Sequence, residues 1–242
     1  DVLEHGKIIG MISFGIDITE QKQRMALVER IRLTSFVKDI SISLAEGTTL
    51  HKILDQCANA VVDYLDAAFA RIWTLNEKEN ILELQASAGV YTHIDGSHSR
   101  IPVGKFKIGR IAQERKPHLT NSIFDDEYIS DKDWAKREGL VSFAGYPLIV
   151  EGHLVGVIAM FACKPLTEFT TRALASVSDI IALGIDRKQS EEALRLSEGK
   201  YRMLIENLPQ RIFYKDKDSR YVSCNENFAR DLKIRPDEIV GK

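Results

Sequence analysis

Six histidines and three cysteines are the side chains of this chain that could act as phosphoacceptors, nucleophiles or metal ligands. No histidine is followed directly by an acidic residue, as a phosphoacceptor histidine of a kinase core requires. The cysteines, Cys57, Cys163 and Cys224, lie far apart without CxxC spacing, which indicates a reducing compartment and neither a zinc site nor a disulfide framework. A phosphate-binding GxxxxGK[ST] loop is also missing. The sequence therefore predicts no catalysis and no metal site.

Composition is typical of a folded and nearly neutral protein. The 242 residues are 44% hydrophobic and 28% charged, the balance of a globular protein. The formal net charge of −2 at pH 7 offers no basic face, so no nucleic-acid partner is predicted. The longest apolar run, Leu154 to Cys163, is too short to cross a bilayer. We expect a cytoplasmic segment without direct membrane contact; an anchor elsewhere in the parent protein is left open.

Two long helices are predicted to frame the middle of the chain. Neither Gly nor Pro interrupts residues 20–46, and Gly47 is expected to end that helix. A second helix is predicted over 167–204, where apolar residues at heptad-like spacing continue into a charged stretch. Such a helix is typical of a lever or of a dimeric coiled coil between two domains.

Between these helices the apolar period changes to two, which predicts strands. The clearest signal is a hairpin in which 142–150 and 153–161 flank the turn Glu151-Gly152, where glycine supplies the positive φ of a tight turn. The acidic stretch 121–136 is predicted as a loop. Its aromatic residues Phe124, Tyr128 and Trp134 are expected to fold back over a pocket or a core.

These residues resemble two known families. Ile205–Pro209 and Phe213–Asp218 look like the opening of a PAS domain, and Asp17–Thr19 is similar to the junction that closes such a domain. Gly139–Leu148 and Leu154–Val157 resemble matching stretches of GAF domains. The order PAS–GAF–PAS resembles that of bacterial sensor histidine kinases.

The resemblance implies a fold class and a domain organisation. The fold class is α+β: a GAF fold with a six-stranded antiparallel sheet and helices packed on one face, long connecting helices, and partial PAS segments at both ends. The implied ranges are 1–19 for the end of one PAS domain, 20–46 for a signalling helix running into the GAF domain, 33–185 for the GAF domain, 167–204 for the connecting helix, and 205–242 for the truncated start of a second PAS domain.

Signatures of GAF relatives narrow the ligand chemistry. The adjacent Cys-His of bilin-binding relatives is missing, which disfavours a bilin. Haem would need an inward-facing histidine; His93, His98 and His118 lie in the right region, but loop histidines are usually solvated, so haem is disfavoured too. Free methionine sulfoxide reductases use this fold with neighbouring cysteines, whereas Cys57 and Cys163 are predicted on separate elements. The cofactor stays unknown, and a small-molecule ligand is left open.

What remains is an apolar pocket with a few polar anchors, the default binding site of such a fold. Arg71 lies in the middle of a predicted strand, so it either points to solvent or anchors an anionic ligand. For each aromatic candidate, plain core packing is the alternative. The candidate lining residues are Arg71, Trp73, Ile111, His118, Trp134, Phe143, Tyr146 and Phe161.

The sequence therefore predicts a sensory and regulatory segment of a signal-transduction protein. A ligand in the GAF domain would shift a homodimeric arrangement of the flanking helices, and Asp17 and Thr19 would couple the first PAS sheet to its exit helix or simply cap that helix. Downstream partners would be a histidine kinase domain of the same chain and, through the parent, a response regulator. The alternatives are a ligand-free structural spacer that only dimerises, and the regulatory part of a diguanylate cyclase or a transcription regulator.

Overall fold

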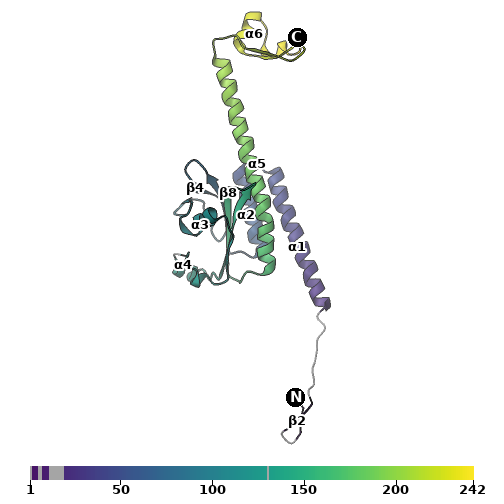
Figure 1. The fold of residues 1–242 in the computed structure, drawn as a ribbon, viewed down its shortest axis with the longest axis vertical. Helices are drawn as coiled ribbons and strands as arrows, with labels where there is room; N and C mark the ends of the chain where they lie inside the picture. The colour runs from purple at the N-terminus through teal and green to yellow at the C-terminus, as the bar shows by residue number, and fades with distance from the viewer. Residues whose placement is uncertain (1, 5–6, 11–18, 130) are drawn as a thin grey trace. The chain divides into compact units, whose positions relative to one another are not determined.

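The computed structural model describes residues 2–4, 7–10, 19–129 and 131–242 (Figure 1). The chain divides into two compact units, Asp1–Ile185 and Asp186–Lys242. Of the two predicted relay residues, Asp17 lies outside the described residues, and Thr19 is the first residue of helix α1. The coupling role of both residues stays a prediction.

A six-stranded sheet forms the centre of the first unit, in the order β5-β4-β3-β8-β7-β6. Every neighbouring pair of strands is antiparallel, so the predicted six-stranded antiparallel sheet is confirmed. The strands are β3 (Phe69–Asn76), β4 (Ile81–Gly89), β5 (Arg100–Pro102), β6 (His118–Thr120), β7 (Ser142–Val150) and β8 (His153–Ala162).

The predicted hairpin is the pair β7 and β8. Its two turn residues, Glu151 and Gly152, have φ angles of 49° and 83°, and positive φ at both positions is what a type I′ turn requires. Pro147 lies beyond the stretch of β7 that pairs with β6, which ends at Gly145. One side of β7 is therefore an edge at Pro147, where a missing backbone N–H breaks no ladder.

Three helices cover one face of the sheet: α1 (Thr19–Glu46), α2 (Leu50–Leu65) and the first half of α5 (Glu168–Asn207) (Figure 1). The α1 helix stops before Gly47, as predicted. The Oγ1 of Thr49 then accepts a hydrogen bond from the backbone N–H of Lys52 at 3.3 Å and caps α2.

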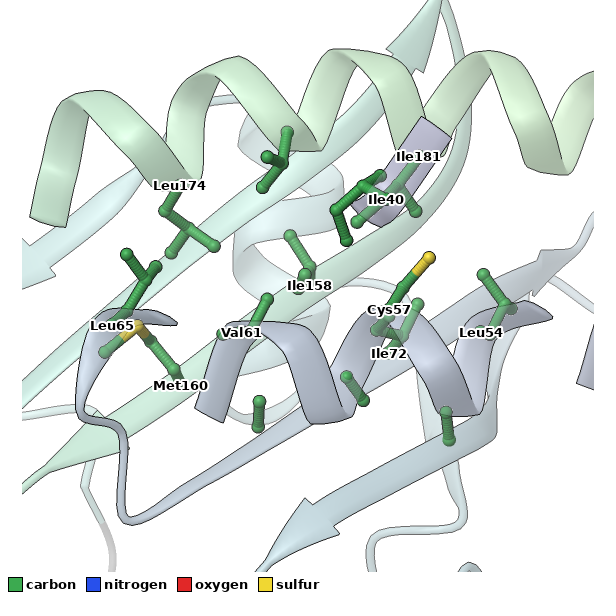
Figure 2. Close-up of a cluster of buried hydrophobic side chains, with 14 of the residues drawn as sticks. Ile40, Leu54, Cys57, Val61, Leu65, Ile72, Ile158, Met160, Leu174 and Ile181 are labelled. Atoms are coloured by element: carbon green, nitrogen blue, oxygen red, sulfur yellow. The ribbon is translucent and has the colours of Figure 1, made fainter. Parts of the chain in front are cut away.

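The core under these helices consists almost entirely of apolar side chains (Figure 2). Ile72 of β3 and Ile158 and Met160 of β8 point from the sheet toward α1, α2 and α5. Cys57 lies among them with no exposed surface, and burial raises the pKa of its thiol to about 12. The interpretation of Cys57 as a core thiol is confirmed.

The other face carries shorter elements: α3 (Phe106–Glu114), the 3₁₀ turn η1 (Ile123–Asp125) and α4 (Lys132–Arg137). The stretch 121–136, predicted as a loop, thus contains two helical pieces. The short α4 forms because the carboxylate of Asp131 accepts the backbone N–H of Trp134 at 2.7 Å, an N-cap hidden in an acidic run.

The second unit comprises the rest of α5 and four short elements. Asn225 organises it: its side chain accepts from the backbone N–H of Ile212 and Phe228 and donates to the carbonyls of Ile205 and Gln210. The PAS assignment of 205–242 stays a prediction. The elements are β9 (Phe213–Lys215), β10 (Tyr221–Cys224), α6 (Glu226–Leu232) and the 3₁₀ turn η2 (Pro236–Ile239).

Near the N-terminus β1 (Val2–Glu4) and β2 (Lys7–Gly10) pair antiparallel. Within the described part of the chain, no helix combines the length and hydropathy that crossing a membrane would need.

The close approach of β8 to β3 yields a first prediction. A Cβ on Gly156 would lie 2.1 Å from the backbone oxygen of Trp73, so the two central strands would have to move apart. We expect Gly156→Ala to lower the free energy of unfolding by about 1–3 kcal/mol, the usual cost of overpacking. Urea unfolding followed by tryptophan fluorescence measures this, because Trp73 and Trp134 both belong to the first unit.

Gly199→Ala is the matched control. Gly199 is helical, and a Cβ there meets nothing within 4 Å. The substitution should leave the tryptophan-reported transition unchanged while favouring helix α5 by up to about 1 kcal/mol. Equal transitions for Gly156→Ala and the unsubstituted chain would contradict the strand spacing described above.

Candidate functional site

A cavity of about 320 Å³ lies on the face of the sheet opposite α1, α2 and α5. Half of its lining residues are aromatic, and the other half are three isoleucines, two histidines and three charged residues. The lining residues are Phe69, Arg71, Trp73, Tyr91, His93, His98, Ile101, Phe106, Lys107, Ile108, Tyr128, Ile129, Asp131, Trp134, Phe143 and Phe161.

Strand register builds the aromatic floor of the cavity. Phe69, Phe161 and Phe143 are direct partners across β3, β8 and β7, so their rings form one row. The ring centres of Phe69 and Phe143 each lie 4.9 Å from that of Phe161, and Trp134 packs edge-on against Phe161 at 5.5 Å. Such ring pairs add stability beyond the area they bury.

Both tryptophans of the cavity wall are held by their indole N–H groups. Trp73 donates to the backbone oxygen of His98 at 3.0 Å, and Trp134 donates to the hydroxyl oxygen of Tyr91 at 3.0 Å. The segment between β4 and β5 is thereby attached to the sheet at one point and to α4 at another. Because their polar atoms are satisfied, the two indoles are fixed walls of the cavity.

Arg71 enters the cavity from the middle of β3. Its Nε donates to the Oγ of Ser87 at 3.1 Å, and this hydroxyl donates in turn to the backbone oxygen of Tyr91 at 2.6 Å. The guanidinium carbon lies 5.6 Å and 5.9 Å from the ring centres of Phe69 and Tyr91. Burial lowers the pKa of Arg71, but guanidinium stays protonated in proteins. Burial and the charge of Arg71 together lower the pKa of His98.

A buried ion pair stands at the side of the cavity. The Nζ of Lys107 lies 2.5 Å from the Oδ2 of Asp126, and only 7% and 4% of these side chains are exposed. The same carboxylate bonds the Nε2 of His118 at 2.8 Å and accepts the backbone N–H of Tyr128 at 2.9 Å. Burial alone would raise the pKa of Asp126, but these hydrogen bonds together hold it below its usual value. Burial lowers the pKa of Lys107, and Asp126 opposes that shift.

Five of the eight predicted lining residues meet in the cavity wall: Arg71, Trp73, Trp134, Phe143 and Phe161. That they bind a ligand stays a prediction. Of the three loop aromatics expected to fold back, Tyr128 and Trp134 line the cavity, whereas Phe124 is 43% exposed.

Three predicted lining residues lie elsewhere and are corrections. Tyr146 packs on the helix face of the sheet, where its hydroxyl donates to the backbone oxygen of Thr171, because even-numbered residues of β7 point away from the cavity. Ile111 is buried between α3 and β7, where it fills the space over Gly145. His118 lies behind the cavity wall: its ring packs against the lining residues Tyr128 and Phe143, and its Nε2 bonds Asp126.

Several lining residues escaped the sequence analysis. The most informative are Phe69, Tyr91, Lys107 and Asp131. Phe69 could have been found, because it has the same strand parity as Arg71 and Trp73. The others come from segments whose place over the sheet no local pattern fixes.

The cysteines do not line the cavity. Cys57 lies in the core on the other face of the sheet, and Cys163 is exposed just after β8, 3.7 Å from the backbone oxygen of Glu138. Among the residues that the structure describes, no group of three or more His, Cys, Asp or Glu is arranged to hold a metal ion.

The ion pair yields a second prediction, with a pH dependence. The pKa of Asp126 is lower in the folded than in the unfolded chain, so its stabilisation is complete at neutral pH and fades as the pH falls through the folded-state pKa. Asp126→Asn leaves Lys107 buried without a counter-charge and should cost about 3 kcal/mol or more at pH 7. The difference in the free energy of unfolding between the unsubstituted chain and this variant should shrink below about pH 4. Urea unfolding at several pH values measures it.

Asp66→Asn is the control for this variant. Asp66 pairs with Lys164 at 3.4 Å, but both side chains are largely exposed, and asparagine tolerates the left-handed conformation of this position. This substitution should cost less than about 1 kcal/mol. Equal costs for the two variants would mean that the Lys107–Asp126 pair stabilises no more than a surface pair.

Comparison with known proteins supports the same fold. A family model described as a GAF domain matches residues 47–186. The GAF domain of a phosphoenolpyruvate-protein phosphotransferase from Coxiella burnetii has a TM-score of 0.60 at 15% identity, over 67% of this chain and 98% of that chain. A search among curated proteins finds no significant match.

Two further solved structures share the fold in different settings. Free methionine-R-sulfoxide reductase from Neisseria meningitidis, in complex with its substrate, has a TM-score of 0.55 at 14% identity, over 76% of this chain and 99% of that chain. A piece of a methyl-accepting chemotaxis protein has a TM-score of 0.53 at 18% identity, over 64% of this chain and 99% of that chain. These identities establish the fold alone. Because the family model matches more than half of the chain and includes all six strands of the central sheet, the chain belongs to the GAF domain family, a fold found in signalling proteins.

Proposed function

We propose that this chain is a sensory and regulatory segment of a signal-transduction protein, without a catalytic step of its own. In the proposal, a small ligand binds in the aromatic cavity and changes how α1 and α5 pack. One observation supports it: the two central strands, β3 and β8, form the floor of the cavity with one face and pack against the helices with the other.

The coupling would run straight through the sheet. On β8, Val157, Ala159 and Phe161 face the cavity side, whereas Ile158 and Met160 face the helices. A ligand that displaces Phe161 therefore moves the backbone that also positions Met160. Because packed interiors are not continuously deformable, a small shift of the sheet would favour one of two discrete helix packings.

The contact between α1 and α5 suits such a shift. A Cβ on Gly184 would lie 2.2 Å from the side chain of Leu44, so the two helices approach closely at this glycine. The surrounding contacts are mostly apolar and non-directional; the half-exposed Glu29–Arg172 ion pair, at 3.8 Å, is a directed contact between the two helices. Since α5 continues to Asn207, it contributes to both units of the chain.

The surroundings of the segment follow from its resemblance to PAS–GAF–PAS proteins. We propose a sensor histidine kinase of a two-component system as the parent, with a kinase domain downstream and a response regulator as its partner. A diguanylate cyclase or a transcription regulator is the alternative output. A ligand-free spacer is the alternative for the GAF domain itself; it would be favoured if Trp73, Trp134 and Phe161 filled the pocket, but these residues line a cavity of about 320 Å³.

The third prediction tests ligand binding. When the chain is purified directly from cells, native mass spectrometry and an absorption spectrum should reveal a co-purifying small molecule. Ile108→Trp should abolish this co-purification, because Ile108 lines the cavity and the larger side chain would fill the cavity. Ile205→Trp, at a partly exposed position of α5 in the second unit, should leave it bound. An empty protein in all three cases would contradict ligand sensing and favour the spacer.

A second copy of the chain is the partner that the helices favour. Met25, Leu27, Val28 and Ile31 of α1 are each more than half exposed. Leu27 and Ile31 precede the buried Phe36 and Ile40 by nine positions, about two and a half helical turns, so they lie on the opposite side of α1. This unpartnered apolar face suits a symmetric helix pair, which would make the chain a homodimer.

The fourth prediction tests this dimer. Val28→Glu with Ile31→Glu should shift the chain from dimer to monomer in light scattering coupled to size exclusion, because four carboxylates would meet in one helix pair. Gln23→Glu with Ala26→Glu adds the same charge at exposed positions of α1 on another side and should leave the mass unchanged. Identical masses for the two double variants would contradict dimerisation through this face.

A further inference from the structure

Arg71 stands out among the cavity residues by the space around it. In the row across the sheet that contains it, its partners are Ser87 on β4 and Ala159 on β8, and Ala159 pairs in turn with Gly145 on β7. The neighbouring row holds the rings of Phe69, Phe161 and Phe143. The guanidinium therefore has small residues beside it and aromatic rings along one edge, which leaves room for a ligand group next to its charge.

The hydrogen-bonding capacity of Arg71 is mostly unused. A guanidinium has five N–H donors, and here Nε donates to Ser87. Among the residues that the structure describes, neither Nη group of Arg71 has a protein acceptor. No carboxylate oxygen of these residues lies within 4 Å of the guanidinium nitrogens. The hydrogen bond from Nε to Ser87, and the onward bond from Ser87 to Tyr91, fix the plane of the guanidinium. They thereby orient the edge that carries its two Nη groups.

The other charged groups of the cavity wall are engaged. Lys107 is paired with Asp126 at 2.5 Å, and the carboxylate of Asp131 caps α4 by accepting the backbone N–H of Trp134. Arg71 is thus the one cation of the lining without a counter-charge in the described part of the chain. An arginine held in this way, with two parallel donors presented to an aromatic cavity, matches the geometry of a carboxylate.

We infer that the ligand of this cavity is a carboxylate with an aromatic or branched apolar body, and that Arg71 binds its carboxylate group. This inference rests on the proposed ligand-binding function. The single unpaired charge matches the single charge of a carboxylate, whereas a phosphate monoester would bring nearly two. The apolar body would lie along the row of rings formed by Phe69, Phe161 and Phe143.

The test compares two carboxylates, each with the neutral amide of the same body, and one phosphate monoester. The compounds are phenylacetate and phenylacetamide, 4-methylpentanoate and 4-methylpentanamide, and phenyl phosphate. Saturation-transfer NMR detects binding, and the fluorescence of Trp73 and Trp134, both in the cavity wall and the only two tryptophans of the chain, gives the dissociation constants. In the unsubstituted chain each carboxylate should bind at least about tenfold more tightly than its amide, as hydrogen bonds to a charged group imply.

Variants at Arg71 assign this preference. Arg71→Gln should bind carboxylate and amide within about threefold of each other, at the affinity that the amide has for the unsubstituted chain. Arg71→Lys keeps the charge without the planar fork and should retain part of the preference, so it also serves if the glutamine variant does not fold. The matched control is Arg172→Gln, at an exposed arginine on α5, which should keep the full preference.

The outcomes separate this inference from the proposed function. Equal affinities for carboxylate and amide in the unsubstituted chain, or an undiminished preference in Arg71→Gln, would overturn the role of Arg71 while leaving ligand binding intact. Tighter binding of phenyl phosphate than of phenylacetate would overturn the carboxylate as the ligand class. Binding of none of the five compounds, together with no co-purifying molecule, would overturn the inference and the proposed function alike.

Discussion

The alternation of side chains along β3 and β8 is the constraint on which the rest of the structure depends. Successive residues of a strand point to opposite faces, so Arg71, Trp73 and Phe161 can reach the cavity only if Ile72 and Met160 reach the helices. A slip of one residue in register would place a guanidinium in the apolar core and leave the cavity wall aliphatic. The core and the candidate site are therefore specified by the same pairing.

This constraint explains how much of the structure the sequence predicts. The sequence predicts the hairpin with Glu151-Gly152 and the helix that stops at Gly47 because turn chemistry and caps are local. The face to which a strand residue points also follows from local sequence. The sequence analysis nevertheless places both Phe143 and Tyr146 in the pocket, although an odd and an even position of one strand point to opposite faces. The pairing of Lys107 with Asp126, in contrast, joins α3 to the end of η1, and no spacing in the sequence indicates it.

The two sides of the sheet are stabilised by different kinds of interaction. The helix side is mainly an apolar core, whose contacts have no preferred direction, with a few directed contacts such as the hydrogen bond from Tyr146 to Thr171 and the Glu29–Arg172 ion pair. The cavity side contains directed contacts: the hydrogen bonds of Trp73 and Trp134, and the buried carboxylate of Asp126 with its three donors. Losing one partner of such a network is costly, so this side keeps its shape. A pocket held by directed contacts, on a sheet whose other face is packed mainly by apolar side chains, would be a suitable division for the proposed sensor.

The size of the possible signal follows from the same division. A ligand shifts a helix equilibrium only by the difference between its affinities for the two packings, and a tenfold difference corresponds to about 1.4 kcal/mol. Shifts of that size are small beside the cost of opening the Lys107–Asp126 pair, so the pocket would not have to unfold to transmit them. They would be large enough to shift the proposed equilibrium between two packings of α1 against α5, which meet where Gly184 lies against Leu44. The sheet lies between the cavity and the helices. To transmit the shift, it needs only to move Phe161 and Met160 together, and they are neighbours on the backbone of β8.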